Sequence, residues 1–117
     1  MRDFRRLVAW QRAHKLAVRV CELVDDSDAY KHRRLLDQLE GAAVSMPANI
    51  AESCGRLTNL DRARFLDYSA GSASELEALV LIARDIGLIS AQTADEICDE
   101  IRQIRKMLAS LIRLLRK

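Results

Sequence analysis

The feature that most constrains this chain is a 4-3 spacing of apolar residues that recurs in four long segments. Alternating steps of four and three place side chains on one face of an α-helix, so each segment is predicted to be an amphipathic helix. Only four glycines and one proline interrupt the 117 residues. A β-sandwich or barrel needs many more turns, and the sequence therefore predicts an all-α protein.

The spacing predicts helices over residues 7–24, 29–54, 60–86 and 91–116. The acidic run at 25–28 ends the first helix and offers N-caps for the second. Asn59 and Ser90 are the expected N-caps of the third and fourth helices. Gly55 and Gly87 are expected to end the second and third helices.

Pro47 lies inside the second segment, where it removes one backbone donor and crowds the preceding turn. We therefore expect a kink near residues 43–46. The links between the predicted helices are short, which favours antiparallel neighbours, and half of the residues are hydrophobic, enough for one core. The sequence predicts one domain over residues 1–117, an up-down-up-down antiparallel four-helix bundle whose second helix is kinked near Pro47.

The second and third predicted helices carry two apolar stripes each, whereas a monomeric bundle needs one. We expect the surplus to cover a homo-oligomer interface. The alternative is that both stripes belong to the bundle core. Trp10 is either an interface anchor or a core residue at the edge of the bundle. The residues expected in the interface are Trp10, Leu66, Val80, Met107 and Leu114.

The net charge of +2 hides a segregation of charge: residues 1–19 carry +5, residues 102–117 carry +6 and the middle of the chain carries −9. The predicted topology brings both termini and the link between helices two and three to one end. We call this end the basic pole and expect it to consist of Arg5, Arg6, Arg56, Arg62, Arg64, Arg113, Arg116 and Lys117. Such a pole attracts phosphates without reading sequence, and acidic residues gather at the opposite end. The alternative is a merely solvated surface.

Polar residues occur on or next to the apolar stripe of the second predicted helix. Asn49 falls on that stripe, and Glu52 follows one turn later. Ser72 lies in a strip of small residues in the third predicted helix. Buried polar groups must be hydrogen-bonded. We expect a buried network of Asn49, Glu52 and Ser72, extended to Arg56 as an option, that sets the register of the helices.

Catalytic signatures are missing from the sequence. It contains no Glu-x-x-His motif, no Cys-x-x-Cys pair and no glycine-rich phosphate loop, so we expect no metal, cofactor or enzymatic activity. Three widely spaced cysteines indicate a reducing cytoplasm. No apolar run approaches the roughly 18 residues that span a bilayer, so no membrane association is expected.

Five groups of residues are distinctive together. They are Trp10-Gln11-x-Ala13, Ala42-Ala43-Val44-Ser45-Met46-Pro47-Ala48-Asn49-Ile50-Ala51-Glu52, Gly55-Arg56, Phe65-Leu66 and Ala70-Gly71-Ser72-x-x-Glu75-Leu76. In this order they resemble the four-helix-bundle proteins of the 23S rRNA intervening-sequence family, over nearly the whole chain. Members of that family look similar to the accessory variability protein of diversity-generating retroelements, a pentameric barrel that binds nucleic acid and a reverse transcriptase.

The resemblance implies a bacterial, cytoplasmic homo-oligomer, with a pentamer favoured, and no enzymatic activity. Two departures stand out. Glu40-Gly41 replaces residues that are often basic in relatives, and Ser53 replaces a frequent glycine. The first removes positive charge from the second helix and leaves the basic pole as the better candidate surface.

Two hypotheses for function follow. The first is an oligomer that binds the phosphate backbone of RNA or DNA through the basic pole. The second is a protein-interaction adaptor that presents Trp10 or the acidic end to another protein, such as a nucleic-acid enzyme, without touching nucleic acid.

Overall fold

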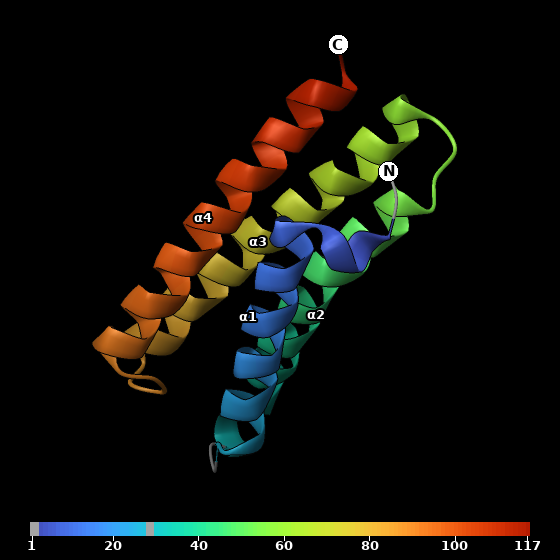
Figure 1. Cartoon of the computed structure of the whole chain (residues 1–117). Coiled ribbons are helices and arrows are strands. Elements are labelled where there is room, and N and C mark those ends of the chain that lie inside the picture. The colour runs from blue at the N-terminus through green and yellow to red at the C-terminus, as the bar shows by residue number, and fades with distance from the viewer. Residues whose placement is uncertain (1–2, 28–29) are drawn as a thin grey trace.

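The computed structural model describes residues 3–27 and 30–117, and the described chain forms four long helices (Figure 1). Two one-turn 3-10 helices, Phe4–Arg6 and Tyr30–His32, precede α1 and α2. The long helices are α1 (Val8–Asp25), α2 (Arg33–Cys54), α3 (Asn59–Asp85) and α4 (Ala91–Leu115). Their bounds agree with the sequence prediction within one residue, except that α2 begins later because residues 30–32 form a tighter turn.

Consecutive helices run antiparallel in a molecule that measures 45 × 20 × 20 Å. The 3-10 turn before α1, the end of α4 and the link between α2 and α3 lie at one end of the bundle (Figure 1). The links between α1 and α2 and between α3 and α4 lie at the other end. This arrangement confirms the predicted up-down-up-down four-helix bundle. Within the described residues, no helix is both long and apolar enough to cross a bilayer.

The observed helix caps agree with the sequence prediction at some helix ends and differ from it at others. Ser90 is the N-cap of α4 and accepts a hydrogen bond from the backbone N–H of Thr93 at 3.0 Å, as predicted. The predicted N-cap Asn59 was wrong, because Thr58 caps α3 by accepting from the N–H of Asp61 at 3.1 Å. Gly87 follows α3 with a φ of 78°, a conformation that favours glycine.

The start of α2 differs from the prediction. His32 occupies the N-cap position and makes no side-chain capping bond, so the acidic run does not cap this helix within the described residues. Asp28, which belongs to that run, lies outside the described residues. Helix α2 continues through the buried Pro47 to Cys54, and the kink expected near Pro47 stays a prediction.

The paired stripes of α2 and α3 are explained by the order of the helices. Helix α2 packs against both α1 and α3, and α3 packs against both α2 and α4, so each needs two apolar faces. Leu66 and Val80, expected at an oligomer interface, are therefore buried inside the bundle, with 0% and 1% of their surface exposed. Their assignment to an interface was wrong, and the alternative that both stripes belong to the core holds for these residues.

Candidate nucleic-acid interface

The basic pole predicted from the sequence is assembled at the end of the bundle that holds both termini. Arg5 and Arg6 lie in the 3-10 turn before α1, Arg56 follows α2, and Arg62 and Arg64 belong to the first turns of α3. Arg113 lies in the last turn of α4, with Arg116 and Lys117 just beyond it. Arg56 and Arg62 are half-buried and the other six side chains are exposed.

The corner between α2 and α3 neutralises two of these cations. Arg56 donates from Nε to one carboxylate oxygen of Asp61 at 2.8 Å, and Arg64 donates from Nε to the other at 2.9 Å. The bonds from Arg64 and then from Arg56 hold the pKa of Asp61 below its usual value. Arg56 also pairs with Glu52, at 3.3 Å between Nη1 and Oε1. These two arginines carry little net charge for an outside phosphate.

Aromatic rings support the same corner. The guanidinium carbons of Arg56 and Arg64 lie 5.0 and 4.9 Å from the centre of the Phe65 ring. Tyr68 meets Phe65 edge-on at 5.3 Å and its hydroxyl accepts from Arg64 at 3.1 Å. Cation–π contacts of this kind hold guanidinium planes in place. The corner is a network of arginines, carboxylates and aromatic rings that contact one another.

Three further cations of the pole have partners within the described residues. Arg5 pairs with Asp3 at 3.1 Å, and Arg116 pairs with Asp67, which ties the end of the chain to α3. Arg62 donates from Nη1 to the side chain of Asn59 at 2.9 Å, while its buried Nε has no hydrogen-bond partner.

The remaining cations of the pole are exposed and are not ion-paired within the described chain. They are Arg6, Arg113 and Lys117. Arg113 donates to the hydroxyl of Ser110, a neutral partner, at 3.2 Å. Around the pole, eight cations face four carboxylates, those of Asp3, Glu52, Asp61 and Asp67, which leaves a surplus of four positive charges.

The difference in charge between the two ends of the bundle is smaller than the sequence suggested. Lys31, Arg33 and Arg34 begin the second helical segment and so lie at the end that was expected to be acidic, together with Arg84 near the end of α3. The helix boundaries already in the sequence could have placed them there. Sequence reasoning also missed Lys106, an exposed cation on α4.

The expected polar network forms in part, around a residue that sequence reasoning had not included. The hydroxyl of Ser45 lies 2.8 Å from that of Ser72, and the amide of Asn49 donates to the carbonyl of Ser45 at 2.9 Å and to its hydroxyl at 3.0 Å. All three residues are half-buried. Glu52 was wrongly included, because it points to solvent with 55% of its side chain exposed and pairs with Arg56 instead.

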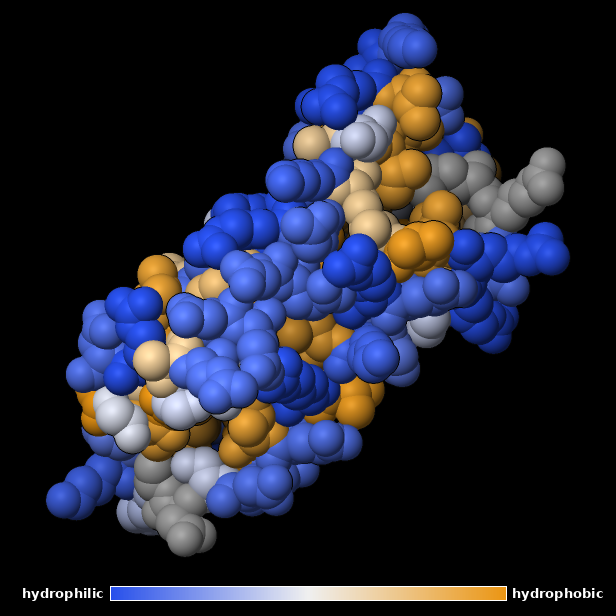
Figure 2. Space-filling view, turned by 60° about the vertical axis from the view of Figure 1, so that its left-hand side comes forward, coloured by the Kyte–Doolittle hydropathy of each residue, from blue (hydrophilic) through white to orange (hydrophobic). Residues whose placement is uncertain are grey.

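The other residues expected at an oligomer interface have different environments. Trp10 is half-buried against the core, stacks on His14 with ring centres 4.7 Å apart and meets Phe4 edge-on at 5.0 Å. This favours the alternative that Trp10 is a core residue at the edge of the bundle. Met107 is half-buried and packs on the core, while Leu114 is 60% exposed. Figure 2 shows hydrophobic side chains at the upper end of the molecule, just below the tip.

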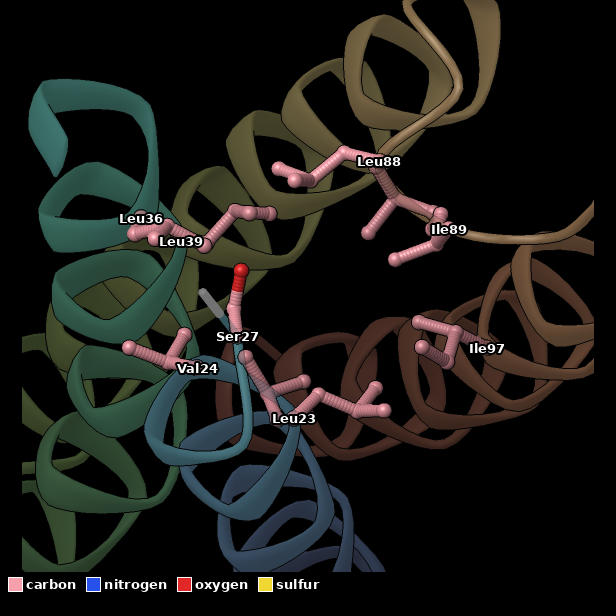
Figure 3. Close-up of a pocket in the computed structure, with 10 residues that line it drawn as sticks. Leu23, Val24, Ser27, Leu36, Leu39, Leu88, Ile89 and Ile97 are labelled. Carbon is pink, nitrogen blue, oxygen red and sulfur yellow. The ribbon is translucent and has the colours of Figure 1, made fainter. Parts of the chain in front are cut away.

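An apolar cavity of about 30 Å³ lies at the end opposite the basic pole (Figure 3). Aliphatic side chains of all four helices and of the link between α3 and α4 line this cavity, and Ser27 is a polar residue of its lining. Ligand pockets usually measure several hundred Å³, so this cavity is too small for a metabolite.

The described residues contain neither a metal-ligand cluster nor a cysteine with a lowered thiol pKa. Within the described residues, no cluster of three or more histidine, cysteine or acidic side chains could hold a metal ion. Burial raises the pKa of the thiols of Cys21, Cys54 and Cys98, which disfavours the reactive thiolate.

Comparison with known proteins gave a family and a fold. The family model described as 23S rRNA-intervening sequence protein matches residues 5–110. The crystal structure of a protein with unknown function from the S23 ribosomal protein family, from Bacteroides thetaiotaomicron VPI-5482, is similar with a TM-score of 0.81. Its sequence is 21% identical, and the match covers 90% of this chain and 98% of that one. No curated protein matched the sequence. Neither description names an enzymatic activity.

Proposed function

Because the chain belongs to the 23S rRNA-intervening sequence protein family, we propose that it is a non-enzymatic homo-oligomer that binds the phosphate backbone of RNA or DNA through its basic pole. The observation that carries this proposal is the surplus of positive charge at that pole. Arg6, Arg113 and Lys117 are exposed there without ion-pair partners in the described chain, and residues 102–117 contain no acidic residue. Exposed cations of this kind bind phosphates by releasing counterions.

The oligomer is proposed to be the pentamer that the family resemblance implies, acting in the bacterial cytoplasm. Its support in this chain is the exposed aliphatic surface near the basic pole, where Leu57, Leu60 and Leu114 are 92%, 76% and 60% exposed. Exposed aliphatic side chains grouped at one end commonly mark a contact surface. Several copies would also multiply a weak phosphate contact into stronger binding.

Sedimentation velocity tests both parts of the proposal. Purified protein would be run alone and with a labelled RNA of about 30 nucleotides, at about 50 and 500 mM salt. We expect a species of pentamer size that binds the RNA at low salt and releases it at high salt. A monomer would contradict the oligomer. An oligomer that binds neither this RNA nor, in a parallel run, a labelled DNA of the same length at low salt would contradict the nucleic-acid function and favour the adaptor.

A pair of charge reversals tests the surface. Arg113→Glu combined with Lys117→Glu reverses two unpaired cations, whereas Arg116 is avoided because it anchors the chain end to Asp67. The matched control is Lys31→Glu with Arg34→Glu, two exposed cations at the opposite end. We expect the first pair to abolish RNA binding at low salt and the control to retain most of it. Equal binding by both variants would rule out this surface.

A further inference from the structure

The cations of α4 and of the residues just after it include two groups, one paired with α3 and the other exposed to solvent. Arg102 and Arg105 both pair with the carboxylate of Glu77 on α3, at 3.2 and 3.1 Å. Lys106 and Arg113 point to solvent, as does Lys117 beyond the end of the helix. The first group therefore joins α4 to α3, and the second group is available to a partner.

Two members of the second group, Lys106 and Arg113, lie on one face of α4. Residues 106, 110 and 113 follow one another at steps of four and three, the spacing of one helix face. With a rise of 1.5 Å per residue, Lys106 and Arg113 lie about 10 Å apart along the axis of α4, and Lys117 follows two residues after the helix ends at Leu115. Ser110, on the same face, accepts a hydrogen bond from Arg113. We call Lys106, Arg113 and Lys117 the basic stripe of α4.

The carboxylates near the basic stripe are engaged elsewhere. In the described part of the chain, no carboxylate comes within 4 Å of the charged groups of Lys106, Arg113 or Lys117, whereas Asp67 is held by Arg116 and Glu77 by Arg102 and Arg105. A second charged surface, the corner around Arg56 and Arg64, is neutralised by its own acids. Within the described chain, the three cations of the stripe are thus not neutralised by an ion pair.

The surroundings of the stripe disfavour a single-stranded ligand. Proteins that bind single strands stack bases on open aromatic rings, and residues 91–117 contain no aromatic residue. Phe65 and Tyr68 are already engaged by arginines, and Phe4 and Trp10 by each other and by His14. Tyr30 is open, with 90% exposure, but belongs to the other end of the molecule.

Helix α4 holds the backbone positions of Lys106 and Arg113 at a set spacing, which suits phosphates that are themselves held at fixed positions. A double helix provides such phosphates whatever its sequence, whereas a single strand must first be ordered, which costs conformational entropy. We propose that the basic stripe of α4 lies along the backbone of double-stranded nucleic acid and that Lys106 is one of its contacts. This inference rests on the proposed function and specifies the form of the ligand.

Fluorescence anisotropy with the intact protein tests the inference. The probes would be a labelled blunt duplex of about 20 base pairs and a labelled unstructured single strand with the same number of phosphates, titrated at several salt concentrations. We expect tighter binding of the duplex. We also expect Lys106→Glu to weaken duplex binding and to reduce the slope of log K against log salt by about one for each protomer in contact. The control, Lys31→Glu, should change neither the affinity for the duplex nor the slope of log K against log salt.

The outcomes separate the two proposals. If the protein binds neither probe at low salt, the proposed function fails and this inference fails with it. If it binds the single strand as tightly as the duplex, or if Lys106→Glu binds the duplex like the wild type, the inference is overturned while the proposed function stands. Far-UV circular dichroism of Lys106→Glu should match the wild type, because Lys106 is exposed and makes no ion pair in the described structure.

Discussion

The hydroxyl of Ser69 is the most deeply buried polar contact between α2 and α3. Ser69 is fully buried and donates to the carbonyl of Met46 at 2.8 Å, immediately before Pro47. We expect Ser69→Ala to lower the free energy of unfolding by about 1 kcal/mol, because the buried carbonyl loses a partner. Urea denaturation would measure the change. Ser74→Ala, the same substitution at an exposed site of the same helix, should cost less than about 0.5 kcal/mol. Equal costs would contradict a special role for the Ser69 bond.

Asp61 gives the α2–α3 corner a dependence on pH. Its pKa is lower in the folded protein, through the bonds from Arg64 and then Arg56, than in the unfolded chain. The stabilising effect of Asp61 is therefore complete above the unfolded pKa and is lost as the pH falls below about 4, through the folded pKa. Urea denaturation at pH 6 and pH 3 should show a smaller loss of stability on acidification for Asp61→Asn than for the wild type. Identical losses would show that the corner contributes nothing to acid sensitivity.

At the scale of helices, the apolar period was enough to predict four elements and their bounds, apart from the start of α2. It could not tell an interior stripe from an interface stripe, because both look alike in sequence. Leu66 and Val80 illustrate the difficulty, since their stripe serves the contacts that a central helix makes with two neighbours. Thr58 and Asn59 are both good cap residues, and only the backbone geometry of the α2–α3 link decided between them.

The cavity at the far end of the bundle offers a way to strengthen the contact between helices. Val24 is buried and lines the cavity of about 30 Å³ together with side chains from the other three helices (Figure 3). We expect Val24→Ile to raise the free energy of unfolding by up to about 0.8 kcal/mol, the value of one buried methylene. Val8→Ile, at a side chain that is 56% exposed, is the control and should change little. Thermal denaturation of both variants would decide, and a destabilised Val24→Ile would mean that the cavity cannot accept the added methyl.

For the whole molecule, the sequence predicts the topology better than it predicts which charged side chains form ion pairs. The gathering of the termini and the α2–α3 link at one end follows from antiparallel helices, so the location of the basic pole was predictable. The ion pairs that the cations of the pole form were only partly predictable. Asp61 and Arg64 lie three residues apart on one helix and could be foreseen. Arg116 and Asp67 are 49 residues apart, and their contact depends on how α3 and α4 pack.

The bundle closes between its first and last helices through charge as well as apolar contact. Arg12 on α1 donates from Nε to Glu100 on α4 at 2.9 Å, with a second bond from Nη2, and Arg19 reaches Glu96 at 2.6 Å. Helices α1 and α4 share the least contact of the neighbouring long helices, so these pairs carry a larger part of their attachment. Arg12 and Glu100 have 35% and 30% of their side chains exposed, which leaves their attraction partly screened by solvent.

A double-mutant cycle with Arg12→Met and Glu100→Gln should therefore give a coupling energy between about 0.5 and 1 kcal/mol at low salt. The coupling should shrink at about 1 M salt, where screening acts over about 3 Å. The same cycle on Arg33 and Asp37, an exposed pair 3.9 Å apart on α2, should give a coupling near zero. A coupling for Arg12 and Glu100 no larger than that of the exposed pair would mean that the bundle closes through its apolar seam alone.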